Sequence, residues 1–307
     1  MVNSANSWHC AVSVASVWTS PESARDIDEL GLTNPVQLNK WLEKLSYEPR
    51  LDLCDGNRIQ TQLLYGEPVL VEEIVGDWAK IIAVWQPSKK DERGYPGWVP
   101  LAQLKKAEPI HAEGFAKVTV DKAQVLDAKE IPTIVVPLNT ILPYIKVEGD
   151  YIHVSTPHGE ALLLNSNVII SESIHQFEKH SSEAAVEKGL EFLDLPYFWG
   201  GMSSYGYDCS GFTYNMFFAC GHSIPRDAGD QAKSGIEIPM EQEELWKKGD
   251  LLFFANDNGK GNVRHVGFYY GEGLLLHSPK TGKSVELLKL IGSYLEKDLC
   301  GVRRYGE

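Results

Sequence analysis

From residue 50 to residue 172, the apolar residues of this chain come in short runs separated by Gly, Pro, Asn and Asp. Short apolar runs broken by turn-forming residues are typical of strands in small twisted barrels. The longest apolar stretches span about five to eight residues, whereas a helix that crosses a bilayer needs ~18. The pattern therefore predicts small β-barrels and no membrane span.

The barrel region shows an internal repeat. The segment from Val69 to Ile81 resembles the segment from Ile141 to His153, and the two align with an offset of 73 residues when Gly76-Asp77 is placed on Gly149-Asp150. This spacing fits one small barrel and its linker, so the repeat favours two copies of an SH3-like barrel.

A helical pattern interrupts the first copy. Ser20-Pro21 has the form of a helix N-cap followed by a first-turn proline, and Gly31 is a helix stop. Apolar residues then recur at helical spacing, at Leu38, Trp41, Leu42 and Leu45. We expect a helical insertion over residues 21–45.

After residue 172 the pattern of apolar residues changes. Residues 183–193 have a helical pattern, a further helix is expected from Cys209, and strands are expected at 250–255, 263–270 and 274–278. This layout indicates an α+β domain. In a chain of 307 residues we predict an SH3-like barrel with the insertion at 1–108, a second barrel at 109–172 and the α+β domain at 173–307.

Charge and cysteine usage limit the partners. The net charge of −13 argues against nucleic acid and anionic membranes, which need a basic surface. The five cysteines are scattered and form no CxxC pair, which favours a reducing compartment over a disulfide framework. The first thirty residues lack a basic start followed by an apolar core, so we expect no signal peptide in this sequence and a cytoplasmic location. A secreted or cell-wall location is the alternative if a signal peptide has been removed.

Cys209 is the first candidate for chemistry. It lies in the first turn of a predicted helix that Gly221 ends. The partial positive charge of a helix N-terminus favours the thiolate, which is the nucleophilic form of cysteine. The alternative is that Cys209 is a buried small apolar residue, the usual state of free cysteine.

Two histidines lie in a predicted hairpin downstream. If its loop is the three residues 271–273, His277 lies opposite Gly267 and on the same face of the sheet as His265. A two-residue loop would place the histidines on opposite faces. The shared face suits a cysteine peptidase in which His265 is the base for Cys209 and His277 orients it. A zinc site made by the same three side chains is the competing use.

Five blocks of sequence over residues 175–307 resemble the NlpC family of bacterial cell-wall cysteine peptidases, which are papain-like in site geometry. The blocks are Pro196-Tyr197-Phe198-Trp199-Gly200-Gly201, Asp208-Cys209-Ser210-Gly211-Phe212, Pro225-Arg226-Asp227-Ala228-Gly229-Asp230-Gln231, Lys248-Gly249-Asp250-Leu251-Leu252-Phe253-Phe254 and His265-Val266-Gly267-Phe268-Tyr269. The resemblance implies a Cys-bearing helix packed on an antiparallel sheet, with Cys209 as nucleophile, His265 as base and His277 as third residue. We expect no cofactor and no metal.

The resemblance also suggests a substrate. Family members that carry N-terminal SH3-like domains are γ-D-glutamyl-L-diamino-acid endopeptidases. They cut murein tri- and tetrapeptides with a free N-terminal L-Ala and release L-Ala-D-Glu, the diamino acid being lysine or diaminopimelate. Such a peptide is anionic, so Arg226 and Arg264 would have to offset the acidic surface.

The resemblance further implies roles for residues around the nucleophile. Tyr197 would line the oxyanion side with the Cys209 backbone N–H, and Asp208 and Ser210 would belong to specificity pockets. Asp208 also suits a helix start without any further role.

Two more residues would hold the substrate's free amine end. Asp227 matches the family position that binds the L-Ala amine, and Tyr95 of the first barrel would close that end of the cleft. Each also fits an ordinary turn. Two other functions stay open: a different thiol amidase or acyltransferase reaction, and a non-catalytic peptidoglycan-binding protein.

Overall fold

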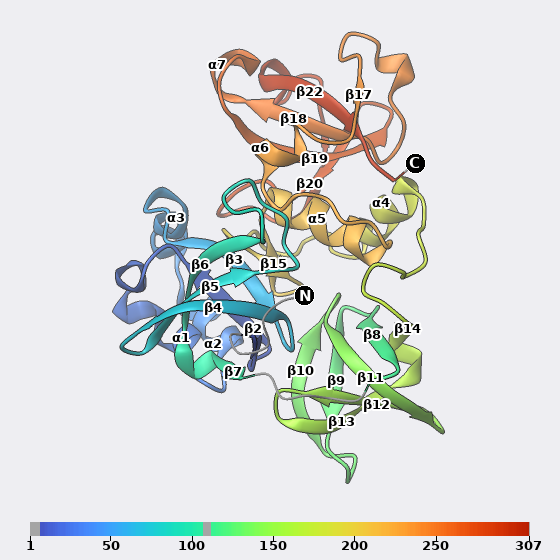
Figure 1. The fold of residues 1–307 in the computed structure, drawn as a ribbon. Helices are drawn as coiled ribbons and strands as arrows, with labels where there is room; N and C mark the ends of the chain where they lie inside the picture. Colours follow the sequence, from blue (N-terminus) through green and yellow to red (C-terminus); the bar gives the residue numbers. More distant parts are fainter. Residues whose placement is uncertain (1–6, 107–111, 307) are drawn as a thin grey trace. The chain divides into compact units, whose positions relative to one another are not determined.

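The computed structural model describes residues 7–106 and 112–306 (Figure 1). The chain forms two compact units. The barrel unit runs up to Gln86 and from Lys90 to Phe177, and the C-terminal unit comprises Pro87–Lys89 and the chain from Glu178. The predicted boundary at 108/109 lies outside the described residues, and the domain boundaries stay a prediction.

The barrel unit contains two seven-stranded antiparallel sheets. The first has the order β3-β2-β6-β5-β4-β1-β7 and the second β10-β9-β13-β12-β11-β8-β14, so each strand of one sheet matches the strand seven places later in the other. The strands of the first are β1 Ser7–Cys10, β2 Val14–Trp18, β3 Ile59–Leu64, β4 Pro68–Val75, β5 Trp78–Ala83, β6 Tyr95–Pro100 and β7 Leu104–Lys106. Those of the second are β8 Gly114–Val118, β9 Lys122–Leu126, β10 Pro132–Pro137, β11 Ile141–Glu148, β12 Tyr151–Thr156, β13 Gly159–Leu164 and β14 Val168–Ser171. The repeat inferred from the sequence is confirmed.

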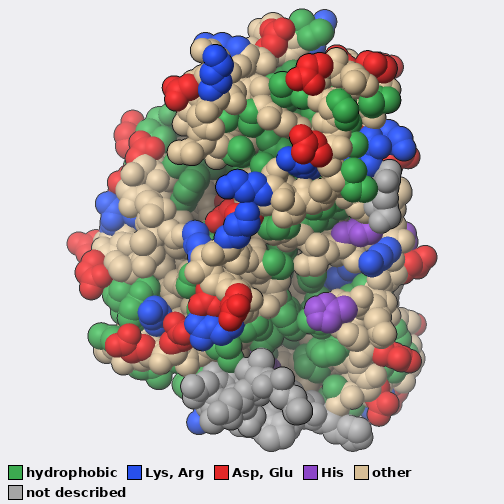
Figure 2. Space-filling model, turned by 45° about the horizontal axis from the view of Figure 1, so that its top comes forward, with side chains coloured by type: hydrophobic (Ala, Val, Ile, Leu, Met, Phe, Trp, Pro, Cys, Tyr) green, Lys and Arg blue, Asp and Glu red, His purple; other side chains and the backbone are tan. Residues whose placement is uncertain are grey.

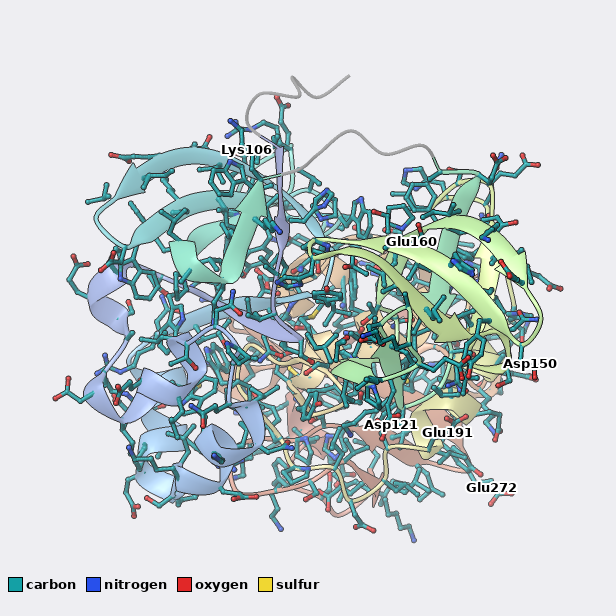
Figure 3. All side chains as sticks on the ribbon, turned by 90° about the horizontal axis from the view of Figure 1, so that it is seen from below. Lys106, Asp121, Asp150, Glu160, Glu191 and Glu272 are labelled. Carbon is teal, nitrogen blue, oxygen red and sulfur yellow. The ribbon has the colours of Figure 1, made fainter. Side chains whose placement is uncertain are left out.

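The central hairpins of the two sheets match in detail. Each turns at a Gly-Asp pair, and Gly76 and Gly149 have φ of 56° and 60°, a conformation that glycine adopts without strain. The bulge between Val71 and Glu73 recurs 73 residues later between Tyr144 and Lys146. Asp150, labelled in Figure 3, marks the second turn.

The first copy carries two elaborations that the second lacks. Between β2 and β3 lie two short helical turns and the helices α1 Glu29–Leu32, α2 Leu38–Lys44 and α3 Tyr47–Asp55, of which α3 follows the predicted insertion 21–45. Between β5 and β6 lies a long loop over residues 84–94, whereas the matching strands of the second copy, β12 and β13, are joined by a two-residue turn. This loop contains the Pro87–Lys89 segment that belongs to the C-terminal unit.

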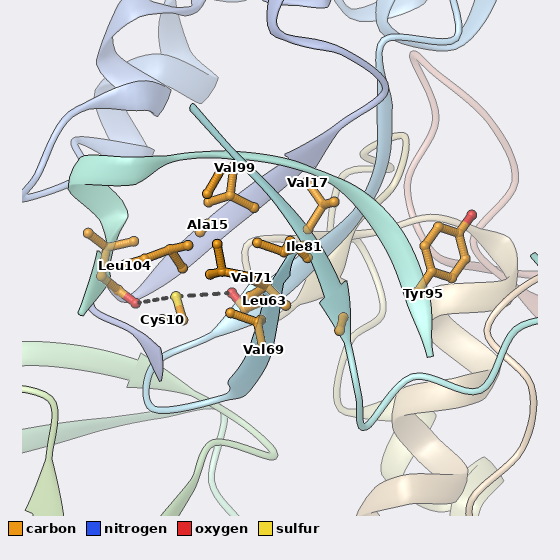
Figure 4. Close-up of a cluster of buried hydrophobic side chains, with 13 residues drawn as sticks. Cys10, Ala15, Val17, Leu63, Val69, Val71, Ile81, Tyr95, Val99 and Leu104 are labelled. Carbon is orange, nitrogen blue, oxygen red and sulfur yellow. Dashed lines mark hydrogen bonds between the residues drawn. The ribbon is translucent and has the colours of Figure 1, made fainter. Parts of the chain in front are cut away.

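Apolar side chains fill the first barrel (Figure 4). Cys10 lies among them, with its thiol 3.3 Å from the Val12 carbonyl oxygen, and burial raises the pKa of this thiol to about 12. Tyr95, at the start of β6, is only 2% exposed and belongs to this cluster. Its hydroxyl accepts a hydrogen bond from Lys90 Nζ, which also lies over the Tyr95 ring.

A carboxyl group is buried at the edge of this core. Glu67 accepts hydrogen bonds from the Leu64 N–H at 2.9 Å and from Gln86 Nε2 at 2.8 Å. Burial nevertheless raises the pKa of Glu67 to about 7, because the low dielectric disfavours the charged form more than the hydrogen bonds favour it.

The C-terminal unit has the predicted α+β fold, with a six-stranded antiparallel sheet in the order β17-β22-β18-β19-β20-β21. Its strands are β17 Ile236–Ile238, β18 Leu251–Ala255, β19 Val263–Gly271, β20 Leu274–His277, β21 Glu286–Lys289 and β22 Leu299–Arg304, and a small hairpin pairs β15 Met202–Ser203 with β16 Gly206–Tyr207. Its helices are α4 Ser182–Leu190, α5 Cys209–Ala219, α6 Ala228–Gln231 and α7 Asn256–Gly259. Phe212 and Phe217 of α5 pack on Phe268 of β19, with ring centroids 5.9 and 5.4 Å apart.

The hairpin of β19 and β20 differs from the predicted three-residue loop. Gly271 pairs with Leu274, so the turn is the two residues Glu272-Gly273, both at positive φ. A bulge at Tyr270 then shifts the register by one residue, and Phe268 pairs with Leu276. The loop prediction was wrong, but the bulge cancels the error and both histidines lie on one face. Figure 3 labels Glu272 at this turn.

Charged side chains of both signs are interspersed on the face drawn in Figure 2. Ion pairs such as Arg93 with Glu72, at 2.6 Å, match charges locally. Among the helices in the described part of the chain, none is long and apolar enough to cross a membrane.

Candidate active site

Helix α5 begins at the candidate nucleophile. Asp208 is its N-cap, in extended conformation, and its carboxylate accepts a hydrogen bond from the Gly211 N–H at 2.7 Å. This bond satisfies one of the N–H groups that a helix start leaves unpaired. Cys209 is the first residue of the helix and is buried.

The two histidines contact each other directly. His265 Nε2 lies 2.7 Å from His277 Nδ1, and the ring planes are inclined by 72°. Gly267 permits this arrangement, because a Cβ atom there would lie only 2.8 Å from the Cβ of His277. Since Nε2 of His265 is engaged, the ring nitrogen left for Cys209 is Nδ1.

Two contacts connect the histidine strands to the nucleophile. The Ser278 hydroxyl, next to His277, donates a hydrogen bond of 2.8 Å to the Tyr207 carbonyl oxygen, two residues before Cys209. The Cys209 thiol interacts with the backbone of Val266, which follows His265. These contacts place the start of α5 against the strands that carry His265 and His277, and the catalytic roles of the three residues stay a prediction.

Burial decides the protonation of the pair at rest. Burial, assisted by the Asp208 carboxylate, raises the pKa of Cys209 to about 12, although Arg226 lowers it in part. Burial, then the neighbouring His277 and Arg264, hold the pKa of His265 well below 6.5. Burial therefore favours a neutral Cys209 thiol and a neutral His265 imidazole in the resting protein. Desolvation of the thiol thus opposes the thiolate that the helix start was expected to favour.

Arg226 joins the residues on both sides of the nucleophile. Its Nη2 lies 2.6 Å from Asp208 Oδ2, and its Nη1 donates to Ser210 Oγ at 2.9 Å and to Asp208 Oδ1 at 3.2 Å. The guanidinium is only 2% exposed. Arg226 therefore neutralises Asp208, and Arg264 pairs with Asp298 at 2.5 Å, so the two cations expected to meet the substrate are matched within the protein.

The Pro87–Lys89 segment packs on the loop that carries Arg226. The Arg226 N–H donates to the Pro87 carbonyl oxygen at 3.0 Å, and the Lys89 N–H donates to Asp230 Oδ2 at 3.0 Å. Asp227 lies between these two anchors, its side chain 33% exposed and without a capping hydrogen bond to α6. No sequence pattern pointed to this segment.

The remaining predicted residues are placed as follows. Tyr197 is buried, and its N–H donates to the Lys283 carbonyl oxygen at 2.9 Å, while the next residue, Phe198, donates to Tyr207 at 3.1 Å. The loop is thus fixed beside the residues before Cys209. Tyr95 belongs to the barrel unit, and its role at the substrate's amine end stays a prediction. Within residues 7–106 and 112–306, no three His, Cys, Asp or Glu side chains form a metal-binding group.

Known proteins share this architecture. The family model described as NlpC/P60 family matches residues 194–304, and one described as YKFC SH3b2 domain matches residues 118–170. The Gamma-D-glutamyl-L-lysine dipeptidyl-peptidase of Bacillus subtilis (strain 168) is 46% identical over 298 residues, which cover 96% of this chain and 98% of that protein. The chain belongs to the NlpC/P60 family.

Further NlpC/P60 relatives match along nearly the whole chain. The protein of the same name from Bacillus cereus (strain ATCC 10987 / NRS 248) is 37% identical, over 96% of this chain and 89% of its own. The crystal structure of an NlpC/P60 family protein from Bacillus cereus ATCC 10987 superposes with a TM-score of 0.91 at 36% identity, covering 98% of this chain and 100% of that one. The chain is therefore a cysteine peptidase of this family, and a purely binding role finds no support.

Proposed function

We propose that this NlpC/P60 enzyme hydrolyses the bond between γ-D-glutamate and the L-diamino acid in murein peptides with a free N-terminal L-Ala, and releases L-Ala-D-Glu. The observation that carries the proposal is the match over 96% of this chain and 98% of a relative named Gamma-D-glutamyl-L-lysine dipeptidyl-peptidase. The Cys209, His265 and His277 arrangement supplies the chemistry for amide hydrolysis. The cytoplasm, where such peptides would be recycled, is the proposed location.

The proposed reaction uses the three residues in two half-reactions. The Cys209 thiol gives its proton to His265 Nδ1 as the sulfur attacks the γ-carbonyl carbon, and the Cys209 N–H and Tyr197 face the oxyanion. Cleavage of the C–N bond transfers that proton to the leaving diamino acid and leaves a thioester on Cys209. A water, deprotonated by His265, then hydrolyses the thioester and regenerates the thiol.

The protonation states fit a general-base route. Because the pKa of Cys209 is raised and that of His265 is lowered by burial, the thiol keeps its proton until a substrate is in place. Proton transfer to His265 then accompanies attack, and His277 holds the imidazole in position.

We assign the substrate's ammonium group to Asp227. Its carboxylate is partly exposed at the start of α6, with Oδ1 4.0 Å from Arg226 Nη1, and the resemblance to the family matches it to the position that binds the L-Ala amine. Tyr95 of the first barrel is the proposed second contact at that end. A buried ammonium–carboxylate contact discriminates strongly, because an acetylated analogue leaves the carboxylate desolvated and unpaired.

The test is a digest of L-Ala-γ-D-Glu-L-Lys, its diaminopimelate counterpart and their N-acetylated forms, read by mass. We expect L-Ala-D-Glu from the free peptides and no product from the acetylated ones. Asp227→Asn should lower kcat/KM for the free peptide by about 1.5–3 kcal/mol of transition-state binding and narrow the preference over the acetylated form. Cleavage of free and acetylated peptides at similar rates would leave only a general cell-wall endopeptidase.

A further inference from the structure

The far side of His277 faces an acid. His277 is 0% exposed, and while its Nδ1 contacts His265, its Nε2 has no hydrogen-bond partner in the part of the chain that the structure describes. The nearest acidic group to this nitrogen is Glu286 on the neighbouring strand β21, which pairs with His277 in the sheet. Glu286 Oε1 lies 3.7 Å from His277 Nε2.

The tautomer of His277 decides whether His265 can act as a base. Burial lowers the pKa of His277 to about 3, so this ring is neutral and carries one N–H. If the His277 proton is on Nδ1, it points at His265 Nε2, which must then accept it as a hydrogen bond. The single proton of the neutral His265 ring is then on Nδ1, so this nitrogen cannot take a proton from Cys209. If the proton is on Nε2, His277 Nδ1 accepts from His265 Nε2–H, and His265 Nδ1 is free to accept.

The productive tautomer needs an acceptor at Nε2. A buried N–H without a partner costs about 1–3 kcal/mol, enough to favour the wrong tautomer by roughly 5- to 150-fold. A carboxylate placed 3.7 Å away reverses that preference and requires only a small side-chain movement to form a hydrogen bond.

Glu286 is available for this contact. Its side chain is 37% exposed, and among the described residues no Lys or Arg nitrogen lies within ion-pair distance of it. The titratable group that also faces it is Tyr294: burial and then the Glu286 charge raise the pKa of this phenol, and Arg264 lowers it. Arg264 is itself bound to Asp298, and Lys280 lies over the Tyr294 ring.

We propose that Glu286 is a positioning residue of the active site, which accepts the Nε2 proton of His277 and so fixes the tautomer that leaves His265 Nδ1 free for Cys209. This inference rests on the proposed function, in which His265 is the base. Glu286 would thus be a fourth residue of the site, on the edge strand β21, beside the three proposed catalytic residues on α5, β19 and β20.

Kinetics on L-Ala-γ-D-Glu-L-Lys test the proposal. Glu286→Ala should lower kcat about 10- to 100-fold with KM changed less than threefold, as is usual when the partner of a functional histidine is removed. Glu286→Gln keeps an acceptor oxygen without the charge, and should fall between Ala and wild type. Glu272→Ala removes an exposed carboxylate from the turn of the same hairpin and should match wild type.

A measurement without substrate separates this inference from the proposed function. Nitrogen-15 chemical shifts of His277 should show a proton on Nε2 in wild type and a substantial fraction on Nδ1 in Glu286→Ala. An Nδ1 proton in wild type, an unchanged tautomer in the variant, or a kcat within twofold of wild type would each overturn the role of Glu286. Failure of wild type to cut the tripeptide, with the tautomer shift present, would overturn the substrate assignment alone.

Discussion

Arg226 and Asp208 form a two-point ion pair beside the nucleophile, in a place from which solvent is almost excluded. The same carboxylate caps α5, so one buried acid serves the helix start and the arginine together. Removing one member of such a pair leaves a buried charge without compensation, which costs far more than the pair contributes when intact.

Arg226→Met should therefore destabilise the C-terminal unit by about 3–5 kcal/mol, as measured by urea unfolding. In an Asp208→Asn background, where the cap oxygen remains but the charge is gone, the same substitution should cost clearly less. Equal costs in the two backgrounds would show that the two groups are not coupled.

Gly267→Ala tests the close approach of the two histidine strands. An added Cβ would lie 2.8 Å from the His277 Cβ, so His277 has to move away from His265. We expect kcat to fall by about 10- to 100-fold, since a displacement near 1 Å costs this much. Gly301→Ala, in β22 of the same sheet, meets nothing within 4 Å and should keep the activity of wild type.

The three proposed catalytic residues should differ in how far their loss reduces turnover. Cys209→Ala removes the nucleophile and little volume, so hydrolysis should fall to background while the unfolding midpoint stays close to wild type. His265→Ala should cost about 10²–10⁴-fold, and His277→Ala less, because it orients the base and does not move the proton. A Cys209→Ala enzyme that keeps more than a few per cent of wild-type turnover would contradict the assignment.

The pH dependence of kcat/KM follows from the buried histidine. Protonated His265 cannot accept the thiol proton, and burial holds the pKa of His265 well below 6.5, so the protonated form appears only at more acidic pH. Activity should therefore persist below pH 6.5, with its acid limb lower than for an exposed histidine. An acid limb of kcat/KM centred at pH 6.5 or above, in a pH series that includes a check of folding, would contradict this prediction.

The buried Glu67 predicts an opposite dependence for the stability of the barrel unit. Its folded pKa of about 7 is above the ordinary glutamate pKa of 4.5, so its contribution to stability is fully present below pH 4.5 and is lost as pH rises through 7. The loss is on the order of 3 kcal/mol, since one pKa unit corresponds to about 1.4 kcal/mol. Glu67→Gln should remove this slope from pH-dependent unfolding, whereas Glu92→Gln, at an exposed position of the same barrel, should retain it.

Local patterns predicted much of the fold. The offset of 73 residues between the hairpins at Gly76 and Gly149 correctly indicated two sheets of equal topology, because turn glycines and alternation are set by nearby residues. The helix starting at Cys209 was likewise readable from its cap and its stop. The bulge at Tyr270 was not, because the sequence Gly271-Glu272-Gly273 is compatible with either loop length.

The site was less predictable wherever burial decides the chemistry. The sequence shows that Cys209 begins a helix but not that desolvation raises its pKa to about 12. The sequence suggested that Arg226 is a cation that meets the substrate. Its contacts with Asp208 and Ser210 depend on the fold of a loop, which the sequence pattern does not predict. Glu286 belongs to no motif identified in the sequence, and it lies beside His277 because β20 and β21 pair in the sheet.

The Pro87–Lys89 segment makes the C-terminal unit discontinuous in the amino-acid sequence. A fragment that starts at residue 178 lacks the carbonyl group that pairs with the Arg226 N–H, although it encodes every proposed catalytic residue. Deleting residues 1–108 would thus alter the loop that carries Asp227 as well as removing a barrel. If recombination exchanges the first barrel for another domain, the site stays intact only if a loop of the new domain makes the same contacts as Pro87–Lys89 with the loop that carries Arg226.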